Sequence, residues 1–113
     1  MKKIYLAAPY SHPDQEIIAS RVKYVNKIAA RLMKTAIVYS PISHCHAIAI
    51  ENELPTDAAF WENQNKAFIK WCDQLVVLKL LGWEQSIGVK QEIAWAREFK
   101  KEIIMVPNQS LWV

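Results

Sequence analysis

The stretch at residues 73–96, DQLVVLKLLGWEQSIGVKQEIAWA, decides how this 113-residue chain folds. Its apolar run at 75–78 is typical of a strand buried on both faces, and apolar residues at helical spacing begin at Ile87. The loop between them and the first turn of the helix contain Gly82 and Gly88, the only glycines of the chain. A buried strand, a loop and a helix form part of a βαβ unit. The stretch therefore predicts a parallel sheet covered by helices.

The same alternation of strands and helices extends over the rest of the chain. Strands are expected at residues 4–8, 36–42, 75–78 and 102–107, and helices at about 13–32, 57–72 and 87–100. Residues 47–53 fit either a short helix or a loop. Right-handed crossovers then give a small doubly wound parallel sheet of four to five strands, in the order 2-1-3-4, with helices on both faces. The prediction is a single α/β domain over residues 1–113.

Composition narrows the class of protein. With 52% hydrophobic and 22% charged residues, the chain suits one compact domain. The net charge of +3 is too small to indicate a nucleic-acid polymer as partner, although it suits a small anionic ligand. The first apolar run is far too short for a membrane span, and its flanks do not fit a signal peptide. Cysteines without a CxxC pair indicate a reducing, cytoplasmic location.

The expected topology selects three loops for a functional site. In a doubly wound sheet, ligands bind beyond the carboxyl ends of the strands, at the switch point between strands 1 and 3. The loops at these ends are APYSH after strand 1, SPISHCH after strand 2 and LGWEQSIG after strand 3. Glycine lets a loop turn sharply and lets its backbone approach a ligand closely. The third loop is therefore a candidate wall of the site.

Glu92 is the candidate for chemistry next to that loop. It follows Gly88 by about one helical turn, so both lie on one face of the helix. Its apolar neighbours Trp95, Ala96 and Phe99 would desolvate the carboxylate and raise its pKa. Such a carboxylate can act as a nucleophile or as an acid–base group, but most helical glutamates are simply solvated. The spacing alone leaves both interpretations open.

Three segments resemble a known family. IYLAAPYSHP (4–13), YSPISHCHAIA (39–49) and the stretch 73–96 resemble the DUF1937 family, and the resemblance extends from Ile4 to Val106. That family is in turn similar to the nucleoside 2-deoxyribosyltransferase superfamily, which includes deoxynucleoside 5′-monophosphate N-glycosidases. The resemblance implies a sheet like those of Rossmann and flavodoxin folds. It also implies cleavage or transfer at the N-glycosidic bond of a nucleoside or nucleotide, without a cofactor.

The superfamily resemblance implies roles for individual residues. Its opening strand matches 5–9, and its ordered Asp, Ser, Gly and Glu match Asp73, Ser86, Gly88 and Glu92. Glu92 would be the nucleophile at the anomeric carbon, and Ser86 would contact sugar or 5′-phosphate oxygens. Tyr5 would lie near the sugar or the nucleophile. The opposite wall would consist of Ala8, Pro9, Tyr10, Ser11 and His12.

The departing base needs a general acid, for which three residues are candidates. Asp73, His44 or His46 could supply this proton, although Asp73 could equally cap a loop. His44, on the loop after strand 2, is expected to line the pocket, with His12 reaching it from the first loop. In HCH, His44, Cys45 and His46 could also suggest a metal site if the segment were extended. Only scattered acids follow, so no metal is expected.

Two departures from the superfamily pattern keep a second function open. Ala8 and Lys90 stand where glycine is frequent. Lys90 would bind a phosphate and depress the pKa of Glu92, or would extend into solvent. A module that binds a nucleotide without turning it over is therefore the alternative to an enzyme. A third alternative is an interaction protein. It is supported by the aromatic residues, some of which could lie on the surface, and by the apolar tail.

The tryptophans and the tail bear on ligand stacking and assembly. Trp83 lies in a site loop and could stack on a base, whereas Trp61, Trp71 and Trp95 are expected to pack in the core or against another subunit. The tail at 108–113, NQSLWV, is expected to pack on something, with a second subunit as one candidate. These features predict a homodimer or higher homo-oligomer.

Overall fold

Four parallel strands form the sheet of the computed structural model, which describes residues 1–107. They are β1 (Lys3–Ala7), β2 (Ile37–Tyr39), β3 (Gln74–Leu78) and β4 (Glu102–Val106), in the order β2-β1-β3-β4. The pairing register sets Tyr5 beside both Tyr39 and Leu75. The α/β class, the parallel sheet and the strand order predicted from the sequence are confirmed.

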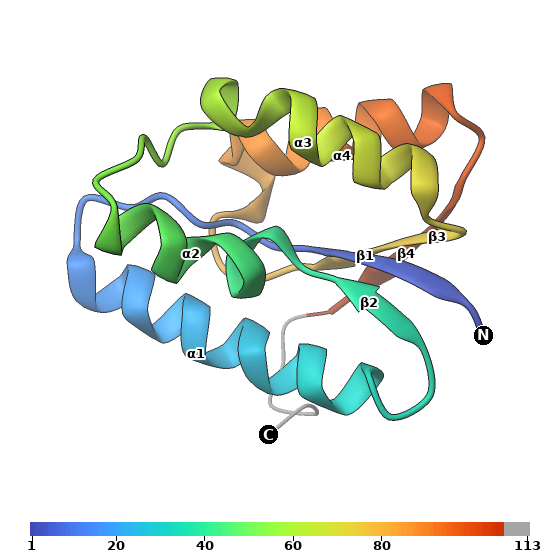
Figure 1. Ribbon diagram of the computed structural model, residues 1–113, viewed down its shortest axis with the longest axis horizontal. Coiled ribbons are helices and arrows are strands. Elements are labelled where there is room, and N and C mark those ends of the chain that lie inside the picture. Colours follow the sequence, from blue (N-terminus) through green and yellow to red (C-terminus); the bar gives the residue numbers. More distant parts are fainter. Residues whose placement is uncertain (108–113) are drawn as a thin grey trace.

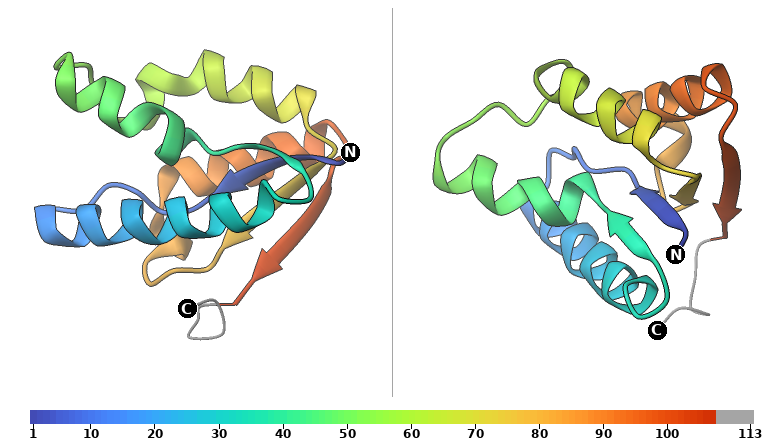
Figure 2. Two further views of the ribbon diagram at one scale, coloured as in Figure 1. Left: turned by 60° about the horizontal axis from the view of Figure 1, so that its bottom comes forward. Right: turned by 45° about the vertical axis from the view of Figure 1, so that its right-hand side comes forward.

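Helices cover both faces of this sheet. They are α1 (Gln15–Leu32), α2 (Pro41–Glu51), α3 (Ala58–Trp71) and α4 (Ile87–Glu98), with a short 3-10 helix, η1 (Trp83–Gln85), in the loop before α4. Figure 1 shows the sheet edge-on, with α1 on one side and α3 and α4 on the other. The two turned views keep this arrangement, and α2 lies beside α1 (Figure 2).

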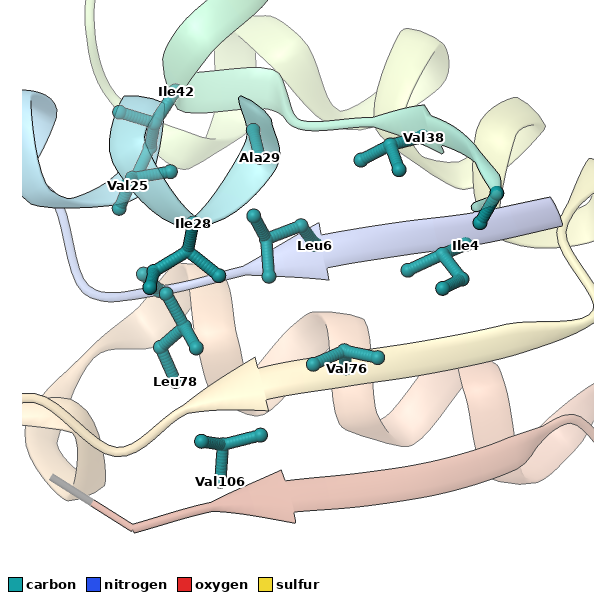
Figure 3. Packing of buried hydrophobic residues seen from close by; sticks show 12 residues of the cluster. Ile4, Leu6, Val25, Ile28, Ala29, Val38, Ile42, Val76, Leu78 and Val106 are labelled. Atoms are coloured by element: carbon teal, nitrogen blue, oxygen red, sulfur yellow. The ribbon is translucent and has the colours of Figure 1, made fainter. Parts of the chain in front are cut away.

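Alternation along the strands fills both layers of the core. On β1, Ile4 and Leu6 lie on the face that α1 covers, in one apolar cluster with Val25 and Ile28 of that helix (Figure 3). The intervening Tyr5 points towards α3 and α4, so it belongs to the second apolar cluster. Because both faces of the central strands β1 and β3 are buried, these strands need continuous apolar runs rather than an alternation of apolar and polar residues. This is why the apolar runs in the sequence identified the strands.

The predicted second strand is too long at its carboxyl end. It was expected over residues 36–42, but β2 ends at Tyr39 and α2 begins at Pro41. Ser40 caps this helix, since its hydroxyl oxygen accepts a hydrogen bond from the backbone N–H of Ser43 at 3.3 Å. Proline at the first helical position has the backbone angle that a helix requires. The Ser-Pro pair was therefore the signal for a helix, and α2 includes residues 47–51 of the undecided segment.

Two further predictions concern a membrane-spanning helix and the C-terminal tail. Within residues 1–107, no helix combines the length and the apolar character needed to cross a membrane. The predicted packing of the tail at 108–113 lies outside the described residues.

Candidate active site

A cleft of about 640 Å³ opens beyond the carboxyl ends of β1 and β3. Its walls come from the loop after β1, from one face of α2, from the first turns of α3, and from the segment that joins η1 to α4. The cleft lies at the switch point of the sheet order, where chain connections leave β1 and β3 in opposite directions. Its size is within the range of pockets that hold small organic ligands.

The base of the cleft holds a buried pair of polar side chains. Glu92 of α4 lines the cleft although it is only 6% exposed, and Tyr5 of β1 lies beneath it with no exposed surface. The Tyr5 hydroxyl donates a hydrogen bond to Oε2 of Glu92. These residues are 87 positions apart in the chain, so the parallel fold is what brings them together.

Burial controls the charge of this pair. Desolvation raises the pKa of Glu92 to about 8, and the hydrogen bond from Tyr5 opposes part of that rise. Burial, followed by the nearby Glu92, raises the pKa of Tyr5 well above its usual value. At pH 7 the Glu92 carboxyl is therefore mostly protonated, with roughly one molecule in ten charged. The sequence-based prediction of a desolvated Glu92 agrees with this arrangement.

Most of the residues predicted for the site do meet around the cleft. They are Ala8, Pro9, Tyr10, Ser11 and His12 from the loop after β1, and Ser86, Gly88 and Glu92 from the start of α4. The Ser86 hydroxyl accepts a hydrogen bond from the backbone N–H of Val89 at 3.2 Å and so caps α4. The two predicted walls therefore face one another across a shared space.

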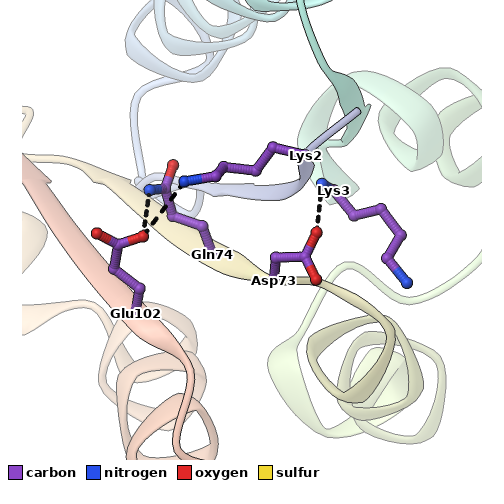
Figure 4. Close-up of polar contacts among 5 residues, drawn as sticks. All are labelled: Lys2, Lys3, Asp73, Gln74 and Glu102. Carbon is purple, nitrogen blue, oxygen red and sulfur yellow. Dashed lines mark hydrogen bonds and ion pairs between the residues drawn. The ribbon is translucent and has the colours of Figure 1, made fainter.

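Asp73 is separated from this cleft. It directly precedes β3, at the amino-terminal edge of the sheet, where its carboxylate accepts a hydrogen bond from the backbone N–H of Lys3 at 2.9 Å (Figure 4). A cleft at the carboxyl ends of parallel strands lies at the other edge. Asp73 therefore anchors β1 to β3, and the predicted acid role for it is wrong.

Three further predicted contacts do not line the cleft. His44 is exposed on α2 and stacks on Tyr39, with 5.2 Å between ring centroids, because HCH is helical rather than extended. Trp83 packs half-buried against the cluster under α4, where Lys79 lies 5.7 Å from its ring centroid. Lys90 is exposed, because two residues along a helix separate it by about 200° from Glu92. Lys90 therefore does not depress the pKa of Glu92.

The metal interpretation depended on His44 and His46 lying on one face of an extended segment. Because HCH is helical, the two side chains do not share a face. Among residues 1–107, no group of three or more metal-binding side chains is placed to hold an ion. His46, one position beyond Cys45, does line the cleft, whereas His44 does not.

Arg21 of α1 is a cleft residue that the sequence interpretation missed. Its guanidinium donates hydrogen bonds to the carbonyl oxygens of Ser11 at 3.0 Å, Tyr10 at 3.3 Å and Leu81 at 2.8 Å. It thus joins the loop after β1 to the loop after β3. A signal was present, because Arg21 follows Ile18 by three residues and falls beside the apolar stripe of the first helix.

Aromatic and amide side chains were also missed. Trp61, Trp95, Asn65 and Gln91 line the cleft, from α3 and α4. The Trp61 indole donates a hydrogen bond to the carbonyl oxygen of Pro55 at 2.8 Å, which fixes its ring. The buried Oδ1 of Asn65 has no hydrogen-bond partner within residues 1–107, so a ligand donor could satisfy it. Helical spacing alone could not tell these positions from ordinary core positions.

The two glycines have different roles. Gly82 has φ of 93°, in the left-handed region, and a Cβ there would come 3.0 Å from Nη2 of Arg21. Gly88 lies in α4, and a Cβ there would meet nothing nearer than the Ser86 hydroxyl at 3.9 Å. Glycine is therefore needed at position 82, both for the positive φ and to leave room for Arg21. At position 88 a side chain would extend into open space of the cleft.

Comparison with known proteins supplies the family. Residues 2–107 match the family model described as a domain of unknown function, DUF1937. The chain belongs to the DUF1937 family. No curated protein matches it.

A solved structure similar to this DUF1937 chain is described as a 2-desoxiribosyltransferase from Leishmania mexicana. The two share 21% sequence identity with a TM-score of 0.63, over 96% of this chain and 66% of the other. The likeness establishes a shared fold. The DUF1937 chain therefore has the doubly wound architecture of that structure over a shorter length.

The arrangement limits the chemistry available to this DUF1937 domain. The cleft combines one buried carboxyl group, one cation engaged by backbone carbonyls, imidazole groups and flat aromatic surfaces. Such a set can hold a small ring-containing molecule and present a carboxyl oxygen to it.

Proposed function

We propose that this protein cleaves or transfers at the N-glycosidic bond of a nucleoside or nucleotide, with Glu92 as the nucleophile. The observation that carries the proposal is the buried Tyr5–Glu92 pair at the base of a cleft of ligand size. Burying a carboxyl group costs folding free energy, and buried groups with strongly shifted pKa values in a cleft are typical of functional sites. The shared fold with a 2-desoxiribosyltransferase supports the same reaction class.

The reaction proceeds in two steps that conserve the anomeric configuration. Glu92, as the carboxylate, forms a bond to C1′ while the bond between C1′ and the base nitrogen breaks. The bonding electrons leave with the base, which takes up a proton. Water or a second base then attacks C1′, loses a proton and releases Glu92 as a carboxylate. Water gives hydrolysis, and a second base gives transfer.

The walls of the cleft suit such a substrate. Trp61 and Trp95 supply flat apolar surfaces on which a base can stack. Ser11, Ser86 and the backbone at Gly88 lie on the facing walls, where a hydroxyl or phosphate oxygen can be bound. The Tyr5 hydroxyl holds Glu92 in one orientation, which reduces the cost of reaching the reactive geometry.

The alternative is a module that binds a nucleotide without turnover. A specific observation favours it: with a pKa of about 8, Glu92 is mostly neutral at pH 7 and is then a hydrogen-bonding group rather than a nucleophile. Lys90 no longer supports this alternative, because it lies outside the cleft.

The decisive experiment measures release of free base from a panel of deoxynucleosides and their 5′-monophosphates. The wild-type protein, Glu92→Gln and the control Glu98→Gln are compared. Glu98 lies exposed on the same helix and outside the cleft, so its substitution controls for the same change of residue type elsewhere on α4. Release by the wild type and by Glu98→Gln, with loss in Glu92→Gln, is the expected result.

Two further outcomes separate the alternatives. Intact-mass measurement after rapid acid quenching should detect a deoxyribosyl adduct on the wild type and none on Glu92→Gln. Binding without release in all three proteins would favour the binding module. Release that persists in Glu92→Gln would contradict the role of Glu92.

A further inference from the structure

We propose that His46, held by Tyr10, is the general acid that protonates the departing base. This inference rests on the proposed function and names the group that the first step still lacks. It starts from a contact between two walls of the cleft: the Tyr10 hydroxyl and Nδ1 of His46 lie 2.6 Å apart. Tyr10 belongs to the loop after β1, His46 belongs to α2, and both line the cleft.

The contact fixes the imidazole in one orientation. The rings of Tyr10 and His46 meet edge to face, with 5.5 Å between their centroids. With Nδ1 occupied by the Tyr10 hydroxyl, the other ring nitrogen, Nε2, remains for a ligand. Within residues 1–107, the structure records no hydrogen bond to this atom. In the imidazolium form, Nδ1–H donates to the Tyr10 oxygen and Nε2–H can donate to the substrate.

The other proton donors in or near the cleft fit the role less well. Glu92 is the nucleophile, and Asp57 is exposed at the start of α3. Nδ1 of His12 accepts a hydrogen bond from the backbone N–H of Asp14 at 2.9 Å, and because a backbone amide can only donate, the acid form with a proton on both ring nitrogens would lose this bond. Asp73 and His44 lie outside the cleft. Among the described residues that line the cleft, His46 combines a half-buried position on α2 with a side-chain contact that orients its ring.

The proton balance of the step is complete. His46 gives the proton on Nε2 to a nitrogen of the base as the C1′–N bond breaks, and the imidazole becomes neutral. The neutral imidazole then takes a proton from the water or second base that attacks C1′. The protein is thereby returned to its starting state. Tyr10 contacts His46 rather than the reacting atoms and is a positioning residue.

Two substrates with different leaving groups test the inference. A purine deoxynucleoside needs a proton on its leaving base, whereas 4-nitrophenyl 2-deoxyriboside releases a stabilised phenolate without one. In single-turnover measurements, which report the first step alone, His46→Gln should lower the rate of base release from the deoxynucleoside by about a hundred-fold, as expected for loss of general acid catalysis, and change nitrophenolate release less than about three-fold. Tyr10→Phe should lower only the first rate, by about ten-fold, with similar KM.

The matched control is His44→Gln, because His44 is on the same helix but outside the cleft. It should leave the ratio of the two rates unchanged. Equal loss of both rates in His46→Gln would overturn the inference and assign the residue to binding or folding. Selective loss in a His12→Gln variant, with none in His46→Gln, would overturn it in favour of His12. Release from neither substrate by the wild type would instead be a failure of the proposed function.

Discussion

Each edge of the parallel sheet holds one of the two carboxyl groups that the sequence pattern marked for chemistry. At the carboxyl-terminal edge, Glu92 is almost fully buried against Tyr5, and its pKa rises to about 8. At the amino-terminal edge, Asp73 is exposed and accepts a hydrogen bond from the backbone of Lys3. One group is an acid isolated from water, and the other is an ordinary strand anchor.

The surroundings explain the difference. Around Asp73 the charges are compensated: Lys2 lies 3.5 Å from the Glu102 carboxylate, which also accepts a hydrogen bond from Gln74 at 2.8 Å (Figure 4). Around Glu92, within residues 1–107, no basic side chain contributes to its pKa, and the Tyr5 hydroxyl alone opposes the effect of burial. The comparison teaches that the edge of the sheet, rather than the residue type, decides which carboxyl group is available for chemistry.

The largest expected effect separates the two carboxyl groups by activity. Glu92→Gln should lower kcat by about a thousand-fold or more, because it removes the nucleophile but keeps the size of the side chain. Asp73→Ala should leave kcat within about two-fold and lower the free energy of unfolding by about 1 kcal/mol, through loss of the bond to Lys3. Steady-state kinetics and urea unfolding measure both effects. A large loss of kcat in Asp73→Ala at unchanged stability would break the comparison.

The second effect is on the pH dependence of stability. In the folded protein Glu92 keeps its proton up to a pH of about 8, whereas the unfolded chain loses it near 4.5. Raising the pH between these values favours the unfolded state, so the stabilisation is complete below about pH 4.5 and is lost progressively up to about pH 8. The total approaches several kcal/mol, at about 1.4 kcal/mol per unit of pKa.

Urea unfolding at a series of pH values tests this, with Glu92→Gln as the control. The variant should lack this component of the pH dependence. For 4-nitrophenyl 2-deoxyriboside, whose leaving group needs no acid, kcat/KM of the wild type should change in the opposite direction and rise towards pH 8, because the nucleophile is the charged form. Equal pH dependence of unfolding in both proteins would mean that Glu92 is not held as a neutral acid.

The third effect separates the two glycines at the carboxyl-terminal edge. Gly82→Ala should lower the free energy of unfolding by about 1–2 kcal/mol, because of its positive φ and the contact with Arg21. Gly88→Ala should leave stability unchanged or raise it by up to about 1 kcal/mol, since alanine favours a helix. The added methyl group should weaken ligand binding, because Gly88 lines the cleft. Calorimetry of unfolding and of nucleotide binding separates these outcomes.

The smallest expected effect concerns Lys90. Because its side chain is exposed on α4 and outside the cleft, Lys90→Ala should change KM for a nucleoside monophosphate less than about two-fold. Arg21→Ala is the variant to compare with Lys90→Ala, because Arg21 lies in the cleft and joins two of its walls. A large rise of KM in Lys90→Ala alone would mean that a phosphate reaches α4 from outside the cleft.

Local patterns were sufficient for the architecture. Continuous apolar runs identified the strands because both faces of the sheet are covered, and apolar spacing identified α1, α3 and α4. The first residues of α2 were wrongly predicted as strand, because Pro41 and Ile42 follow the apolar run at 36–39 directly, whereas in the structure Ser40 caps a helix there. Because of that error, His44 was predicted on a loop. In the structure it lies exposed on a helix, and His46 lines the cleft instead.

The sequence by itself determined the sheet order and the two facing loops, because these follow from short apolar runs, whereas spacing made Glu92 only a candidate and the superfamily resemblance supplied its expected role. Only the tertiary structure decided the partners: Tyr5 for Glu92, Tyr10 for His46 and the backbone of Lys3 for Asp73. These contacts join distant segments, and their geometry depends on how helices pack on the sheet. Burial also depends on that packing, and burial is what converts one glutamate among many into an acid with a pKa of about 8.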